Sequence, residues 1–288
     1  MNSQSNGDST NAAAFCREQI QGVDPLFRVS SLFADKDVAQ RLLPLYALFA
    51  CVEQLCASVS DESVAARKLE WWRGALAGND KASGEHPVIA ELRRSGAMER
   101  LPQDSLARLL DMVAYRIEAP ATPGVDELAR LCRMTGSPPL ELELAVAGNT
   151  ASQVPSGMAA RRGLMQLLRE DLGRERHSWW LPLGLMAKYG VRRDDIPGGE
   201  AAGAVNDLLA EAVNGAIGKE ADSSPEKTDI SFFNQNDRHI YVYDELCRRK
   251  LEHTKKSSYK KRREILFRPR AGDLFCCWNA ARRFSRQK

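Results

Sequence analysis

The chain has 288 residues, of which 43% are hydrophobic and 27% are charged, and its formal net charge is +3. These values are ordinary for a globular protein and exclude a collagen-like, a largely disordered or a disulfide-dense chain. Isoleucine occurs only 8 times and threonine 6 times, and this shortage of β-branched residues favours helices over strands. Apolar runs fall short of the roughly 18–20 residues that cross a bilayer, so we expect no transmembrane segment.

The first ten residues carry neither the basic nor the apolar part of a signal peptide. We therefore expect residues 1–14 to be a disordered leader, residues 15–288 to form one domain, and the protein to be cytoplasmic. Seven scattered cysteines without a C-x-x-C pair predict reduced thiols. Four histidines without zinc-ligand spacing make a transition-metal site improbable.

Positive charge gathers at the C-terminus. From Arg248 to Lys288 there are 15 Lys and Arg against 3 Asp and Glu, whereas the rest of the chain is net negative. A basic segment on an acidic body indicates an anionic partner: phospholipid, nucleic acid or an acidic protein surface. The alternative is a solvated helix face that needs no partner. Tyr259 is a single aromatic within the basic run, a weak signal for stacking, so nucleic acid is the least favoured of the three.

Apolar residues spaced three and four apart predict helices along most of the chain. In residues 35–58, for example, Val38, Leu42, Leu45 and Phe49 share one helix face. Strand alternation and repeats of 20–50 residues are both missing from the sequence. We therefore predict an all-α fold, with helices over residues 35–58, 61–76, 86–94, 103–118, 125–147, 157–174, 183–188, 200–217, 238–253 and 274–284.

The sequence lacks the motifs of several enzyme classes, including the nucleophile elbow, the P-loop and the dinucleotide-binding fingerprint. All-α enzymes commonly place carboxylates on facing helices to hold metal ions. Magnesium takes oxygen ligands, and carboxylates at i and i+4 share a helix face, so D-x-x-x-D is the natural motif for Mg²⁺–diphosphate.

Five short motifs occur in an order that resembles squalene and phytoene synthases, the head-to-head trans-isoprenyl diphosphate synthases. From about residue 15 to the C-terminus, the matching segments are Leu45-Tyr46-Ala47-Leu48-Phe49 with Glu53-Gln54-Leu55-Cys56-Ala57 (family L-Y-A-F-x-R-x-x-D-D-x-x-D), Leu69-Glu70-Trp71-Trp72-Arg73, Leu164-Met165-Gln166-Leu167-Leu168-Arg169-Glu170 (family L-T-N-I-L-R-D), Leu181-Pro182 with Tyr189-Gly190-Val191, and Trp278-Asn279-Ala280-Ala281-Arg282. The resemblance implies the isoprenoid synthase fold, a single helical domain around a central cavity that houses prenyl chains. It also implies two acidic motifs on facing walls of that cavity.

The first acidic motif departs from the family pattern. Glu53, Gln54 and Ala57 stand where the family has D-D-x-x-D. Only one carboxylate of three remains, and Ala57 removes the i+4 partner that would complete a metal clamp.

The second acidic motif is also degenerate. Arg169 and Glu170 match the family's R-D, but Arg174 stands four residues beyond Glu170 and reverses the charge. A shift of one residue offers Asp171 and Glu175 as an i, i+4 pair, on a face rotated by about 100°. We interpret that shifted pair as a solvated charged turn, with a second metal clamp as the alternative.

These departures predict a non-catalytic protein without intact catalytic residues, metal ligands or a cofactor. The chain is similar to the degenerate branch that includes the mitochondrial complex I assembly factor, because Arg169, Arg174, Arg176 and His177 form a basic run before the Leu-Pro corner. That resemblance implies a binding or assembly role, for example for a respiratory membrane complex. It also implies a peripheral position at the inner membrane with a protein partner there, and a prenyl or other lipid in the central cavity.

Two other functions remain open. The first is a divergent Mg²⁺-dependent prenyltransferase that uses farnesyl or geranylgeranyl diphosphate, with Glu53, Glu170, Asp171 and Glu175 at its metal site. Ionising a prenyl diphosphate requires Mg²⁺ at the leaving group, which the degenerate motifs serve poorly. The second is nucleic-acid binding through the basic C-terminal region.

Overall fold

The computed structural model describes residues 4–58, 61–78, 86–118, 121–149, 153–171, 179–198, 202–221, 230–255, 257 and 259–287. Every regular element within these ranges is a helix, so the predicted all-α fold is confirmed. The α-helices are α1 (Gln4–Val23), α2 (Pro25–Ser30), α3 (Lys36–Ser58), α4 (Glu62–Leu76), α5 (Pro87–Arg94), α6 (Gln103–Glu118), α7 (Val125–Ala147), α8 (Ser156–Asp171), α9 (Leu183–Tyr189), α10 (Asp195–Gly198), α11 (Ala202–Ala221), α12 (Arg238–Lys255), α13 (Tyr259–Phe267) and α14 (Ala271–Gln287). Short 3₁₀ helices are η1 (Ser31–Phe33), η3 (Met98–Arg100), η4 (Ile230–Phe232) and η5 (Gln235–Asp237).

The N-terminal helix differs from the sequence prediction. Residues 4–14, for which we expected a disordered leader, form the first half of α1. This segment includes three consecutive alanines, which are strong helix formers. The second half of α1 buries Cys16 and Ile20, and the helix packs against α3 and α5. A helix that is packed over its second half therefore continues N-terminally into residues that hydrophobic periodicity does not mark.

The short helix α2 follows directly and was not predicted. Asp24 caps it, since its Oδ1 accepts a hydrogen bond from the backbone N–H of Leu26 at 3.2 Å. Pro25 occupies the first helical position, where its missing N–H costs nothing. The turn between α1 and α2 thereby fixes the Asp24 carboxylate at the edge of the central helices.

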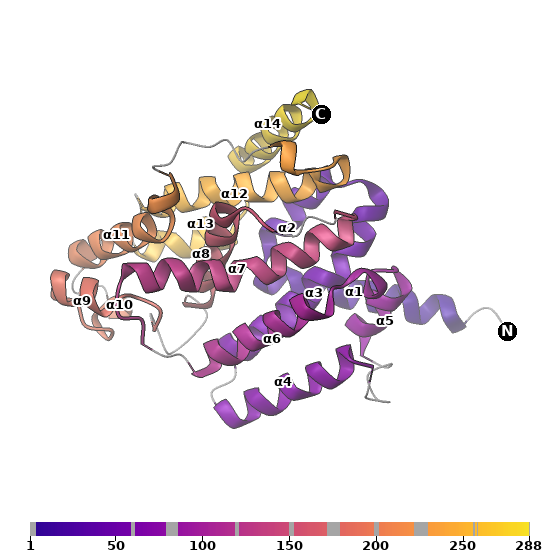
Figure 1. The fold of residues 1–288 in the computed structure, drawn as a ribbon, viewed down its shortest axis with the longest axis horizontal. Helices are drawn as coiled ribbons and strands as arrows, with labels where there is room; N and C mark the ends of the chain where they lie inside the picture. The colour runs from indigo at the N-terminus through magenta and orange to yellow at the C-terminus, as the bar shows by residue number, and fades with distance from the viewer. Residues whose placement is uncertain are drawn as a thin grey trace.

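Helices α3, α7, α8 and α12 form the centre of the fold (Figure 1). Helices α1, α5 and α6 pack on α3, and α4 packs on α6. Helix α11 joins α7 and α8 at the opposite end of the molecule, where α9 also lies. The central helices bury leucines: Leu42 and Leu45 lie on the predicted face of α3, and Leu164 and Leu167 are buried in α8.

Helices α7 and α8 touch backbone to backbone. A Cβ atom built on Gly163 of α8 would lie 1.8 Å from the carbonyl oxygen of Cys132 in α7. One built on Gly136 of α7 would lie 1.9 Å from the carbonyl oxygen of Ala159 in α8. Because both contacts involve backbone atoms, the two glycines set the register of α8 against α7. That register positions the charged side chains of α8 described below.

The C-terminal helix α14 is anchored on α12 by a buried ion pair. The Lys250 ammonium lies 2.6 Å from the Asp273 carboxylate, and it also donates to the carbonyl oxygen of Arg268 at 3.2 Å. Burial lowers the pKa of Lys250, whereas the Asp273 carboxylate opposes that shift. Among the described helices, none is both long enough and apolar enough to cross a membrane.

Candidate functional site

A buried group of charged and phenolic side chains lies where the resemblance places the two acidic motifs. It is built from α3, α6, α7, α8 and α12 and from the cap of α2. We call it the central charge cluster, and its members are Asp24, Tyr46, Glu53, Arg116, Glu143, Arg162, Arg169, Glu170 and Tyr243.

The second-motif carboxylate, Glu170, is bound to an arginine of another helix. Arg116 of α6 donates to Glu170 Oε2 from Nε at 2.9 Å and from Nη2 at 2.6 Å. The two side chains are only 1% and 4% exposed. Burial alone would lower the pKa of Arg116, but Glu170 and other neighbours raise it above its usual value. This charge-assisted pair neutralises Glu170 with a guanidinium.

The neighbouring Arg169 is tied to the start of α2. Its Nη2 lies 2.8 Å from Asp24 Oδ1 and donates to the Tyr243 hydroxyl at 3.1 Å. The Tyr243 hydroxyl in turn donates to Asp24 Oδ2. Asp24, Arg169 and Tyr243 therefore form a closed triangle of polar contacts that joins α2, α8 and α12.

Arg162 forms a third ion pair, about two helical turns before Glu170 on α8. Its Nη2 lies 2.6 Å from Glu143 of α7, and its Nη1 donates to the Tyr46 hydroxyl at 3.2 Å. The guanidinium also stacks 3.6 Å from the centroid of the Tyr243 ring. A cation over an aromatic face in a desolvated site is stabilising by about 2 kcal/mol.

Glu53 is the member of the cluster that no hydrogen bond connects to the described part of the chain. It is partly exposed and lines the small cavity at the centre of the cluster. Desolvation raises its pKa to about 7, and the nearby positive charges of Arg116 and Arg169 oppose this shift. Glu53 is therefore a protonatable carboxyl among fixed ion pairs.

Glu53 predicts a measurable pH dependence. Its folded-state pKa of about 7 exceeds the ordinary value of 4.5, so its proton stabilises the fold at low pH and the benefit is lost as pH rises through 7. Glu53→Gln cannot ionise, so the variant should gain stability relative to the wild type from pH 4.5 to 8, by on the order of 3 kcal/mol. Urea unfolding of both proteins across this range measures the difference. A difference that does not change with pH would contradict the raised pKa.

The cavity at the cluster is small. Its volume is about 40 Å³, and its walls include Phe49, Ala50, Pro139 and Gln166 besides the charged residues. One water needs about 10–15 Å³ of such volume, whereas pockets for drug-sized ligands span about 300–1,000 Å³. The cavity accommodates a few waters in this conformation. A prenyl chain would fit only after cluster side chains moved aside.

The donor set does not fit a Mg²⁺ clamp within the described residues. No group of three or more Asp, Glu, His or Cys side chains is arranged there to hold a metal ion. The Glu170 carboxylate faces Arg116. The other motif carboxylate in the cluster, Glu53, has Ala57 at i+4 in place of a second carboxylate. A metal would have to displace an arginine before it could bind Glu170.

The predicted site residues divide into three groups. Glu53, Arg169 and Glu170 meet in the cluster. Gln54 turns away from it, since its side-chain amide donates to Gln19 of α1 at 3.4 Å. The remaining positions lie outside what the structure describes: the side chains of Ala57 and Asp171, and all of Arg174, Glu175, Arg176 and His177.

The partners of these residues were not predicted from the sequence; they are Asp24, Arg116, Glu143, Arg162 and Tyr243. The sequence contains a signal for two of these partners. Arg116 falls on the apolar face of α6, three residues after Val113, and Glu143 falls three residues after Leu140 on the buried face of α7. A charge on a buried helix face needs a partner, and the predicted Arg169 and Glu170 of α8 were candidates.

Comparisons with known proteins identify the fold and the family. The chain resembles the structure of a dehydrosqualene synthase in complex with ligand, at 15% identity and a TM-score of 0.71, over 98% of this chain and 99% of that one. It also resembles squalene synthase HpnC from Alicyclobacillus acidocaldarius, at 18% identity and a TM-score of 0.52, over 96% and 95% of the two chains. At these identities the likeness shows the isoprenoid synthase fold. No curated protein sequence matches the chain. The profile of the family described as squalene/phytoene synthase matches residues 20–227, so the chain belongs to the squalene/phytoene synthase family.

Proposed function

We propose that this chain is a non-catalytic member of its family that acts as a binding or assembly protein. The observation that carries the proposal is the buried ion pair between Arg116 and Glu170. It occupies the second acidic motif, where the family resemblance places a metal-binding carboxylate. A carboxylate that already accepts two hydrogen bonds from a buried guanidinium is a poor ligand for a hydrated Mg²⁺.

Charge balance supports the same conclusion. Prenyl diphosphates bring several negative charges into one site, and the departing diphosphate needs a metal ion to neutralise it. The cluster instead balances its own charges internally, with Arg116 on Glu170, Arg169 on Asp24 and Arg162 on Glu143. Removing one partner of such a pair leaves a buried charge, which costs about 3–5 kcal/mol. The network thus opposes the rearrangement that catalysis would require, and we propose that no cofactor is needed.

The binding or assembly role rests on the sequence resemblance to the degenerate branch of the family. We propose a protein partner at a membrane surface, with a respiratory complex as the leading example. A lipid in the centre is compatible with this role if the cluster opens around Glu53, whose side chain already lines the cavity.

The test is turnover of farnesyl and geranylgeranyl diphosphate by the purified full chain with Mg²⁺, read by mass spectrometry of the extracted products. We expect no product above that of a sample without protein. Mg²⁺-dependent product that disappears in Glu53→Gln and Glu170→Gln, while circular dichroism shows both variants folded, would overturn the proposal. That outcome would establish the divergent prenyltransferase instead, and the shifted pair Asp171 and Glu175 would become the next positions to change.

A further inference from the structure

A basic groove lies on the surface between α12 and α14, two helices that run next to each other (Figure 1), and it shares no lining residue with the central cavity. Its volume is about 580 Å³, far larger than that of the central cavity. Five arginines line it together with two glutamates, so its formal charge is positive; the arginines are Arg248, Arg249, Arg282, Arg283 and Arg286.

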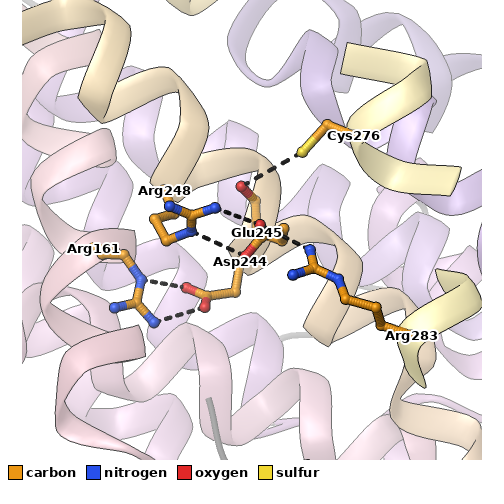
Figure 2. Close-up of polar contacts among 6 residues, drawn as sticks. All are labelled: Arg161, Asp244, Glu245, Arg248, Cys276 and Arg283. Atoms are coloured by element: carbon orange, nitrogen blue, oxygen red, sulfur yellow. Dashed lines mark hydrogen bonds and ion pairs between the residues drawn. The ribbon is translucent and has the colours of Figure 1, made fainter. Parts of the chain in front are cut away.

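Contacts inside the groove divide these arginines into two groups. Glu245 of α12 accepts hydrogen bonds from Arg248 at 2.5 and 3.0 Å and from Arg283 of α14 at 3.0 Å (Figure 2). Arg249 lies 3.5 Å from Asp273. Arg283 and Arg249 therefore join α14 to α12, whereas Arg248 pairs with Glu245 within α12. The weak contact of Cys276 Sγ with the carbonyl oxygen of Glu245 also links the two helices.

Arg282 and Arg286 have a different role. Both are exposed, and neither has a carboxylate partner among the described residues. They stand four residues apart on the same face of α14, about one helical turn from each other. Their charges are available to an external anion.

The same face of α14 carries an apolar patch next to these arginines. Leu274, Phe275 and Trp278 are 46%, 64% and 48% exposed. The Phe275 and Trp278 rings stack at a centroid distance of 6.1 Å, and the Arg282 guanidinium lies 5.3 Å from the Trp278 ring. Other large apolar side chains that are exposed in the described residues, such as Leu32 and Met134, lie on other helices. The exposed stripe of α14 is thus apolar in its first half and basic in its second.

We propose that this stripe, made of Leu274, Phe275, Trp278, Arg282 and Arg286, docks the protein on an anionic phospholipid bilayer. Phenylalanine and tryptophan rings insert at the level of the headgroups, where their apolar faces leave water. The two arginines then reach the negatively charged lipid headgroups on either side. The pairing of Glu245 with Arg283 stays in place and holds α14 on α12.

The chemistry of the stripe favours a bilayer over the other anionic partners. Leu274 adds an aliphatic group, which suits a lipid surface and gives nothing to base stacking. A nucleic-acid strand would need a continuous track of free cations, but Glu245 holds two of the groove arginines. The stripe would be the surface through which the protein reaches a membrane in the proposed function, and the inference rests on that part of the proposal. It is independent of turnover, so the failure of one can be told from the failure of the other.

Co-sedimentation of the full chain with lipid vesicles tests the proposal. Vesicles of phosphatidylcholine with phosphatidylglycerol should bind the protein, vesicles of phosphatidylcholine alone should bind it much less, and binding should weaken as salt rises from about 0.1 to 1 M. Replacing Arg282 and Arg286 together by Gln should lower the partition coefficient about 25-fold. The matched control replaces Arg67 and Lys68 by Gln, which removes the same charge from exposed positions on α4 and should bind like the wild type.

A second pair of variants tests the apolar half of the stripe. Replacing Phe275 and Trp278 together by Ser should lower partitioning at least about tenfold. The control replaces Leu183 and Met134 by Ser; these residues are similarly exposed, at 46% and 43%, on α9 and α7. Vesicle binding that both stripe variants retain would overturn the proposal. So would a lack of vesicle binding combined with salt-sensitive binding of a single-stranded oligonucleotide that the stripe variants lose.

Discussion

Replacement of Arg116 by methionine is expected to lower the free energy of unfolding by about 3–5 kcal/mol. Methionine fills much of the same space without a charge, so the loss would report the ion pair and little else. Without Arg116, the Glu170 carboxylate would stay buried at 4% exposure with two hydrogen bonds removed. Urea denaturation with linear extrapolation measures the change.

The double variant Arg116→Met with Glu170→Met distinguishes a mutual pair from two unrelated losses. Because both charges are then absent, most of the stability lost in the single variants should return. A more exposed arginine of the same helix supplies the control: Arg108 of α6 contacts Glu141 of α7, and the Arg108 side chain is 53% exposed. Arg108→Met should cost no more than about 1 kcal/mol. Equal losses of stability in Arg108→Met and Arg116→Met would contradict a strong buried ion pair. So would simple additivity of the two single losses in the double variant.

Substitution of Gly163 by alanine is expected to destabilise the fold by about 3 kcal/mol or more, at the upper end of the range for overpacked sites. The added Cβ would lie 1.8 Å from a backbone oxygen of α7, and a backbone atom cannot rotate out of the way as a side chain could. Relief requires α8 to slide or separate from α7. That movement would also strain the contact between Arg162 of α8 and Glu143 of α7.

Gly74 is the matched control for this substitution. It lies within α4, and a Cβ built on it meets nothing within 4 Å. Gly74→Ala should therefore stabilise the protein by up to about 1 kcal/mol, the difference in helix propensity between the two residues. Thermal or urea unfolding of the two variants gives the comparison. A Gly163→Ala variant as stable as Gly74→Ala would show that α7 and α8 do not pack in backbone contact.

The helices were predictable because their signals are local. Hydrophobic periodicity and flanking Gly and Pro residues place α6 and α7 with the same boundaries as the structure, and α3 within one residue. Helix α1 was missed because its first residues are polar and small, and its helical state depends on packing against α3 and α5. Helix α2 was missed because it is too short to show a period, although its Asp-Pro start is a capping signal.

The site was predictable only in part, for a related reason. Motif order placed Glu53, Arg169 and Glu170 at the centre, and the structure brings these three together. Their partners come from distant parts of the chain: Arg116 is 54 residues from Glu170 in sequence. Such pairs depend on how helices cross, which no local pattern encodes. The departures in the acidic motifs could be read from the sequence. The arginines that pair with the remaining carboxylates could be identified only from the fold.

The most direct test of the closed, ion-paired centre is a calorimetric titration of farnesyl diphosphate into the full chain with Mg²⁺ present. We expect no saturable, Mg²⁺-dependent binding, because the central cavity is about 40 Å³ and Glu170 is held by Arg116. Saturable binding that requires Mg²⁺, disappears in Glu170→Gln and persists in Gln54→Ala, whose side chain faces α1, would contradict it.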